Sequence, residues 1–185
     1  MHLTYVCTNY NNSHYTIAAV KSIARNVGHC LRVYVVDNAS RASDIEQLQE
    51  LERCNSIVRI ISNKENVGYF AGLNLGIKAA LKDDPQLTWM VVGNNDLEFP
   101  SDFCDKVESQ QSNYSLYSVI SPDVVTLEGE HQNPHVISNI STLREIFYDL
   151  YYSNYWLGVL IYKLAKMFPR NRTEDTVIDP KEFAK

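Results

Sequence analysis

Short apolar runs alternate with segments of helical periodicity over the first 120 residues. The runs are rich in valine, isoleucine and other strand formers, and they predict five strands, at 3–7, 31–37, 57–62, 88–92 and 117–121. Between them, apolar residues recur every three or four positions, which predicts helices at 15–23, 45–51 and 70–81 and a further one after Pro100. Strands that are apolar on both faces and alternate with helices predict an α/β fold, a mostly parallel sheet with helices on both faces.

The pattern changes after residue 122. Residues 121–139 are polar and contain two prolines and one glycine, which predicts a loop. Apolar positions at helical spacing then predict one long amphipathic helix over 143–168, followed by a polar tail. We therefore expect a core domain at 1–122 and a partial second region at 123–185.

The predicted helix at 143–168 has an unusual composition. Residues 150–162 carry no charge but include four tyrosines and a tryptophan, and 163–172 contain four basic residues and no acid. An uncharged stretch this short cannot span a bilayer, which needs about 20 residues. Two interpretations stay open: a helix lying on a membrane surface, or a helix that packs on the sheet or forms a homodimer contact.

Composition excludes several classes of protein. The chain has 185 residues, of which 45% are hydrophobic and 21% charged, and this excludes a disordered or fibrous chain. Its net charge of −5 and the lack of a strongly basic domain argue against nucleic-acid binding. Four cysteines lie far apart without metal-ligand spacing, and the N-terminus lacks a signal-peptide pattern. Both features favour a cytoplasmic protein with buried thiols.

Polar residues follow four of the predicted strands at the point where each strand ends. The four segments are Thr8 to Asn12, Asp37 to Ser40, Asn63 with Asn66 to Asn74, and Gly93 to Asp96. Asn and Asp favour turns, so one such segment means little. Because the carboxyl ends of parallel strands meet at one edge, where ligands bind in open α/β sheets, four together predict a polar site along that edge.

The residue types at this edge suit a pyrimidine nucleotide. An ionised carboxylate such as Asp37 only accepts hydrogen bonds, so it can take the imide N–H of uracil or thymine. Gly68 and Gly72 allow the backbone to approach a ligand, and the helix that starts there offers free N–H groups. Asp96 is one carboxylate, which suffices for a Mg²⁺ ion that also binds phosphates. The chain has no P-loop or dinucleotide glycine motif.

Three segments together resemble the bacterial family 2 glycosyltransferases, with greatest similarity to rhamnosyl- and galactosyltransferase-like members. They are VVDNAS at 35–40, NVGYFAGLNLGI at 66–77 and GNND at 93–96, in the same order and spacing as in that family. The resemblance covers residues 3–122 and implies a GT-A fold, which is Rossmann-like. It also implies inverting transfer of a sugar from a UDP- or dTDP-sugar to a cell-envelope saccharide, which can be lipid-linked. Mg²⁺ or Mn²⁺ would be the cofactor.

The resemblance also implies a role for individual residues. It implies that Asp96 is the metal ligand, because Asn95 and Asp96 occupy the position of the family's DXD-type motif, although Asn94 and Asn95 stand where the family has acids. The expected nucleotide-binding residues are Thr8, Asn9 and Tyr10 at the base and ribose, Asp37 at the pyrimidine, Asn66, Gly68 and Asn74 at the nucleotide and sugar, and Asn95 and Asp96.

No segment of the sequence matches the part of the family that supplies the catalytic base. The nearest candidate base is Asp175, in the acidic pair that it forms with Glu174. We therefore expect the donor-binding half of a transferase that ends before the acceptor half. The alternatives are a non-catalytic nucleotide-sugar-binding remnant or assembly subunit, and a nucleotidyltransferase. The nucleotidyltransferase would need a glycine-rich basic loop after the first strand, and residues 8–15 provide none.

Overall fold

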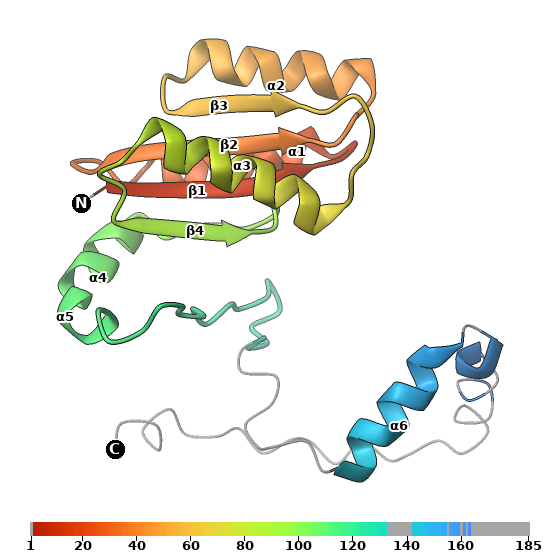
Figure 1. Cartoon of the computed structure of the whole chain (residues 1–185). Coiled ribbons are helices and arrows are strands. Elements are labelled where there is room, and N and C mark those ends of the chain that lie inside the picture. The colour runs from red at the N-terminus through yellow and green to blue at the C-terminus, as the bar shows by residue number, and fades with distance from the viewer. Residues whose placement is uncertain (1, 133–141, 155, 160, 162, 164–185) are drawn as a thin grey trace. The chain divides into compact units, whose positions relative to one another are not determined.

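The computed structural model describes residues 2–132, 142–154, 156–159, 161 and 163 (Figure 1). The chain divides into two compact units, Met1–Ile120 and Ser121–Lys185, and each is described by itself.

The first unit is built on a four-stranded parallel sheet. Its strands are β1 (His2–Asn9), β2 (Cys30–Asp37), β3 (Val58–Ser62) and β4 (Trp89–Gly93), in the order β3-β2-β1-β4 (Figure 1). All three pairings are parallel, with Asn9 opposite Asp37 and Asp37 opposite Ser62. Four of the five predicted strands and the parallel sheet are confirmed.

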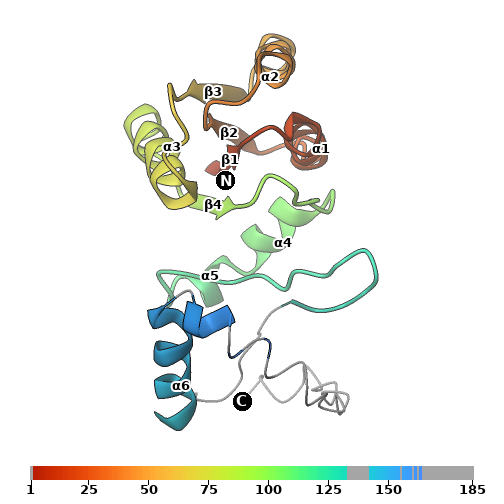
Figure 2. The same ribbon diagram turned by 90° about the vertical axis from the view of Figure 1, so that its right-hand side faces the viewer.

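Helices cover both faces of this sheet. Helices α1 (Ser13–Ile23) and α2 (Ala42–Cys54) lie on one face and α3 (Tyr69–Asp83) lies on the other, as the end-on view of Figure 2 shows. The core follows the alternation of the strands: Tyr5 and Cys7 pack with α1 and α2, whereas Val6 packs with α3. The predicted α/β architecture with two helical layers is confirmed.

Two glycines let α3 lie close to the sheet. A Cβ atom built on Gly76 would be 2.5 Å from Cγ1 of Val6 and 3.0 Å from Cγ2 of Val36. One turn earlier, a Cβ atom on Gly72 would be 2.8 Å from Cγ2 of Thr8. All three distances are shorter than a carbon–carbon contact allows. These glycines therefore determine how closely the first half of α3 approaches the ends of β1 and β2.

The start of α1 is bonded to α2. The Ser13 backbone N–H and hydroxyl both donate to Oδ1 of Asp44, at 2.9 and 2.7 Å, while Asn12 makes no capping bond with its side chain. These hydrogen bonds hold the pKa of Asp44 below its usual range. A carboxylate here also suits the positive end of the helix, so α2 supplies the cap that α1 lacks.

The predicted strand at 117–121 is wrong. After α4 (Phe103–Ser109) and α5 (Gln111–Tyr114), which include the helix expected after Pro100, residues 117–121 form no strand. Tyr117 and Val119 are 66% and 87% exposed. An apolar run becomes a strand only if a neighbour accepts its backbone bonds and buries its side chains, and no described strand does so here.

The second unit differs from its prediction in one respect. Helix α6 (Thr142–Ser153) forms, but the expected single helix over 143–168 is interrupted at Asn154. The side-chain oxygen of Asn154 accepts the backbone N–H of Trp156 at 2.9 Å, so it caps a new helical turn instead of continuing α6. The rest of the predicted helix, from 164 to 168, lies outside the described residues. No helix within the described residues has the length and apolar character that crossing a membrane requires.

The four cysteines are free thiols. Cys7 and Cys104 are buried, as expected, but Cys30 and Cys54 are exposed, so the prediction of buried thiols is wrong for these two. Burial raises the pKa of Cys7 to about 12, which makes it a packing residue and not a nucleophile.

Candidate functional site

The polar segments that follow the four strands lie along one edge of the sheet. Strand β1 is central, with Asn9 opposite Asp37 on β2 and Cys7 opposite Gly93 on β4. The segment after Gly93 therefore lies on the other side of Asn9 from Asp37, and the side chains of these neighbouring segments bond to one another.

Asp37 is buried in a cage of protein donors. It is 1% exposed, and its Oδ1 accepts the Asn9 amide at 2.9 Å and the Ser40 hydroxyl at 2.5 Å. Its Oδ2 accepts the Ser40 backbone N–H at 3.0 Å. These three bonds provide hydrogen-bond partners for both oxygens of the buried carboxylate and fix the turn after β2. Recognition of a pyrimidine by Asp37 stays a prediction, because the carboxylate here is already surrounded by protein groups.

Asn95 is turned inward in the same way. It is 7% exposed, and its Nδ2 donates to Oδ1 of Asn12 at 2.9 Å and to Oγ1 of Thr16 at 2.8 Å. Thr16 in turn donates to Oδ1 of Asn9 at 2.8 Å. The chain of bonds from Asp37 through Asn9 to Asn95 thus connects the ends of β2, β1 and β4. We call Asn9, Thr16, Asp37, Ser40 and Asn95 the buried amide network.

Thr16 and Ser40 were not predicted as site residues. Thr16 lies on the buried face of α1, where an isolated hydroxyl in the sequence gives no sign that it faces the end of a strand 79 residues away. Ser40 belongs to the DNAS segment, and its spacing of three from Asp37 is the one signal that could have indicated a hydroxyl-to-carboxylate turn.

Asp96 is exposed next to the buried amide network. Its charge lies close enough to the Tyr69 hydroxyl to contribute to raising that group's pKa, after burial and the nearby Cys7. Asp96 and the start of α3 both follow the carboxyl ends of parallel strands, β4 and β3. In the part of the chain that the structure describes, no three His, Cys, Asp or Glu side chains gather as a metal cluster. One exposed carboxylate does suit a divalent cation that takes its remaining ligands from a diphosphate and water.

The start of α3 is fixed to the end of β2. The Asn38 amide donates to the Gly68 carbonyl at 3.2 Å, and the Asn63 amide donates to the side-chain oxygen of Asn38 at 2.9 Å. Gly68 has a φ of +86°, and its N–H donates to Oδ1 of Asn66 at 2.9 Å. No side chain caps α3, so its first N–H groups are open to an anion.

The remaining predicted residues have different surroundings. Thr8 is half-buried against Gly72, Tyr10 is half exposed in the loop after β1, and Asn74 is exposed on the second turn of α3. Asp175 lies outside the described residues.

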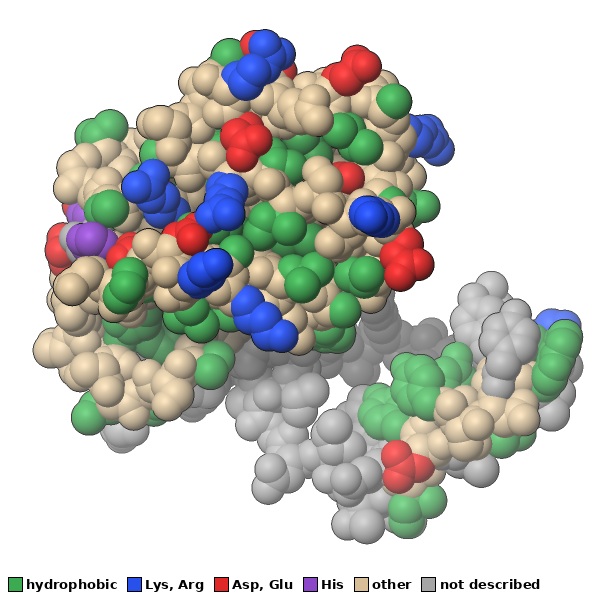
Figure 3. Space-filling view, turned by 45° about the horizontal axis from the view of Figure 1, so that its top comes forward, with side chains coloured by type: hydrophobic (Ala, Val, Ile, Leu, Met, Phe, Trp, Pro, Cys, Tyr) green, Lys and Arg blue, Asp and Glu red, His purple; other side chains and the backbone are tan. Residues whose placement is uncertain are grey.

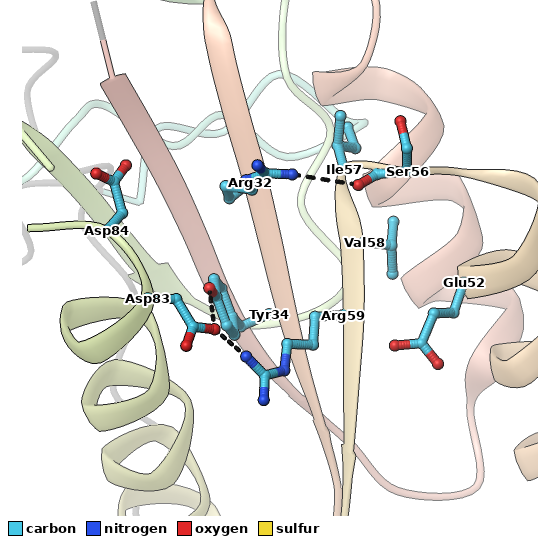
Figure 4. A pocket seen from close by; sticks show the side chains of 9 residues that line it. All are labelled: Arg32, Tyr34, Glu52, Ser56, Ile57, Val58, Arg59, Asp83 and Asp84. Atoms are coloured by element: carbon cyan, nitrogen blue, oxygen red, sulfur yellow. Dashed lines mark hydrogen bonds and ion pairs between the residues drawn. The ribbon is translucent and has the colours of Figure 1, made fainter. Parts of the chain in front are cut away.

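A cavity of about 380 Å³ lies away from this edge, at the amino ends of β2 and β3 (Figure 4). Its charged groups already have partners within the protein. Asp83 accepts the Tyr34 hydroxyl at 2.9 Å and pairs with Arg59, while Arg32 donates to the Ser56 carbonyl at 3.3 Å. This cavity therefore shares no residue with the predicted site, and its charged groups stabilise the fold.

Charge is mixed over the surface of the first unit. On the face drawn in Figure 3, basic and acidic side chains alternate and do not gather into a patch of one sign. This distribution provides no broad field for a polyanion on that face.

Comparison with known proteins gives one family. The sequence model of glycosyl transferase family 2 matches residues 4–172. An uncharacterised glycosyltransferase of Haemophilus influenzae is 31% identical over 72 residues, which are 39% of this chain and 22% of the relative.

Solved structures are similar in fold. S. aureus TarS 1–349 in complex with UDP-GlcNAc has a TM-score of 0.53 at 13% identity, over 70% of this chain and 42% of that one. The same protein without the ligand in its description has a TM-score of 0.50 at 16% identity, over 70% and 43%. The matched parts thus span less than half of these structures and about a fifth of the curated relative.

Proposed function

The chain belongs to glycosyl transferase family 2, and from that premise we propose that it binds a UDP- or dTDP-sugar at the carboxyl edge of the sheet. It transfers the sugar, of rhamnosyl or galactosyl type, with inversion to a cell-envelope saccharide acceptor, which can be lipid-linked. One observation carries the proposal: the segments that hold Asp37 and Asp96 lie along one edge and are joined through Asn9 and Asn95. The Haemophilus relative is named a glycosyltransferase, and TarS is described with UDP-GlcNAc, in agreement with this donor class.

In this proposal the diphosphate lies between Asp96 and the start of α3. Asp96 holds Mg²⁺ or Mn²⁺, which when bound neutralises the negative charge of the departing diphosphate. The uncapped N–H groups of α3 favour the same negative charge. Thr8, Tyr10, Asn66, Gly68 and Asn74 surround the nucleotide and sugar, and the buried amide network holds Asp37 and Asn95 in place.

Inverting transfer also requires a base that takes the proton of the acceptor hydroxyl. Asp175 stays the candidate in this chain. The alternative is a protein that binds nucleotide sugars without turnover, as a remnant or an assembly subunit. Radiolabelled UDP-sugars distinguish the two, because any release or transfer of the sugar excludes a purely binding protein.

We expect D96A to abolish the metal dependence of nucleotide binding. Titration calorimetry of UDP, dTDP and GDP, with and without Mn²⁺, will show the preferred pyrimidine diphosphate binding more tightly with the ion. In D96A the increase in nucleotide affinity that Mn²⁺ causes is smaller by roughly tenfold or more, because the cation loses its one protein carboxylate. The control is E46A, which removes an exposed carboxylate on α2 that is not among the predicted site residues. Unchanged Mn²⁺ dependence in D96A would contradict the assigned role.

The region around α6 is proposed to contact the inner face of the plasma membrane. Ile146, Tyr152 and Trp156 are 58%, 77% and 76% exposed, and the sequence 163–172 adds four basic residues. Exposed aromatic and basic groups favour anionic lipid interfaces.

Flotation with anionic vesicles at low salt tests this membrane contact. We expect the protein to float and the double variant Y152S/W156S to bind several-fold less, because two interfacial side chains are lost. The control L127A removes a 98% exposed apolar side chain from the same unit. A wild-type protein that stays unbound and sediments as a dimer would favour the homodimer interpretation instead.

A further inference from the structure

Phe70 is a large apolar side chain exposed at a functional edge. It is 78% exposed on the first turn of α3, and its ring lies edge-to-face with that of Tyr69, with centroids 5.2 Å apart at 74°. Scattered apolar residues on a surface need no explanation. Phe70 differs because its helix turn belongs to the candidate site and is rigidly held there.

Two contacts hold this turn in place. Gly68, two residues before Phe70, accepts the Asn38 amide at 3.2 Å. Gly72, two residues after it, lies so close to Thr8 that a Cβ atom would be 2.8 Å from the threonine methyl. The Phe70 ring is therefore presented from a fixed backbone, which lowers the entropy cost of binding a ligand to it.

A polar group lies on the same side of the helix. Asn74 follows Phe70 by four residues, so their side chains are neighbours on α3, and Asn74 is exposed. Within the described residues its side-chain amide has no hydrogen-bond partner. An aromatic face beside an amide that can both donate and accept matches a sugar ring, which has an apolar C–H face and hydroxyl groups around its rim.

We propose that Phe70 is a stacking platform for a pyranose ring, with the Asn74 amide bonding to that ring's hydroxyls. The inference rests on the proposed function and extends it by naming a sugar subsite on α3. The ring can come from the donor sugar or from the acceptor saccharide, since both offer the same chemistry.

Two binding experiments on the full chain test the stacking platform and distinguish a donor sugar from an acceptor saccharide as the bound ring. The first compares UDP with UDP-GlcNAc and UDP-galactose by calorimetry in the presence of Mn²⁺. The second uses saturation-transfer NMR with the methyl glycosides of glucose, N-acetylglucosamine, galactose and rhamnose. The variants are F70A, F70L and F70Y, with L81A as control because Leu81 is 57% exposed at the other end of α3.

If the donor sugar stacks on Phe70, F70A and F70L weaken UDP-sugar binding by roughly three- to tenfold and leave UDP binding unchanged, while F70Y restores it. If the acceptor stacks there, the glycoside signal falls in F70A and F70L with no change in donor binding. An equal loss of affinity for UDP and for the UDP-sugars means that the ring stacks on the base, and it overturns the proposal. The proposal is also overturned if F70A binds the UDP-sugars and the glycosides as wild type and L81A do. Absence of all nucleotide binding by wild type would refute the proposed function, whereas the glycoside experiment still decides the role of Phe70.

Discussion

N95D lowers the free energy of unfolding by about 2–4 kcal/mol, whereas N94D changes it by less than about 0.5 kcal/mol. Both substitutions add one carboxylate at the end of β4, but Asn94 is exposed and Asn95 is 7% exposed. The amide of Asn95 donates to Asn12 and Thr16, and a carboxylate at this place cannot donate. It would also bring a second negative charge into the network that contains Asp37.

Urea unfolding followed by circular dichroism measures both variants, and its pH dependence identifies the cause. A buried aspartate without donors has a raised pKa in the folded state, so the folded variant binds more protons than the unfolded one. The penalty of N95D is therefore full near pH 7 and shrinks as the pH falls toward 4. Equal stability of N94D and N95D at pH 7 would show that Asn95 is not an internal anchor.

G76A destabilises the protein by about 1–3 kcal/mol, even though alanine favours a helix over glycine by about 1 kcal/mol. The added methyl group would lie 2.5 Å from Cγ1 of Val6, and both Val6 and Val36 are fully buried. Helix α3 must therefore move away from the sheet or the valines must change rotamer. Because α3 carries Phe70 and begins directly after Gly68, we expect nucleotide binding to weaken in parallel.

A double-mutant cycle with V6A provides the control. V6A alone creates a cavity and costs stability, but in combination with G76A the new methyl group fills part of that space. We expect the double variant to be more stable than the sum of the two single effects by at least about 1 kcal/mol. Additive effects would mean that α3 can shift without strain.

The sequence allowed the layers of the first unit and the positions of the polar strand ends to be predicted, because both depend on local periodicity. It did not reveal which polar side chains point inward. Asp37 and Asn95 read alike as ligand-binding residues, yet both are buried by partners 28 to 86 residues away in the chain. Only the folded sheet brings such partners together.

The two errors in secondary structure have local causes that depend on context. Residues 117–121 have the composition of a strand, but strand formation requires a neighbour to pair with. The apolar stripe through 143–168 continues past Asn154, yet the Asn154 side chain competes for backbone N–H groups and starts a new turn. The periodicity of a sequence predicts which side chains form an apolar face. It does not predict which backbone groups form hydrogen bonds.

The position of β1 in the sheet affects how the protein folds during synthesis. Of the four strands, β1 leaves the ribosome well before one of its two neighbours, β4, which ends at Gly93. A nascent chain that stops short of β4 can pair β1 only with β2, and it leaves the other flank of β1 and the side chain of Thr16 without Asn95. Such an intermediate exposes an unpaired apolar strand edge, which is prone to aggregation, until β4 has emerged.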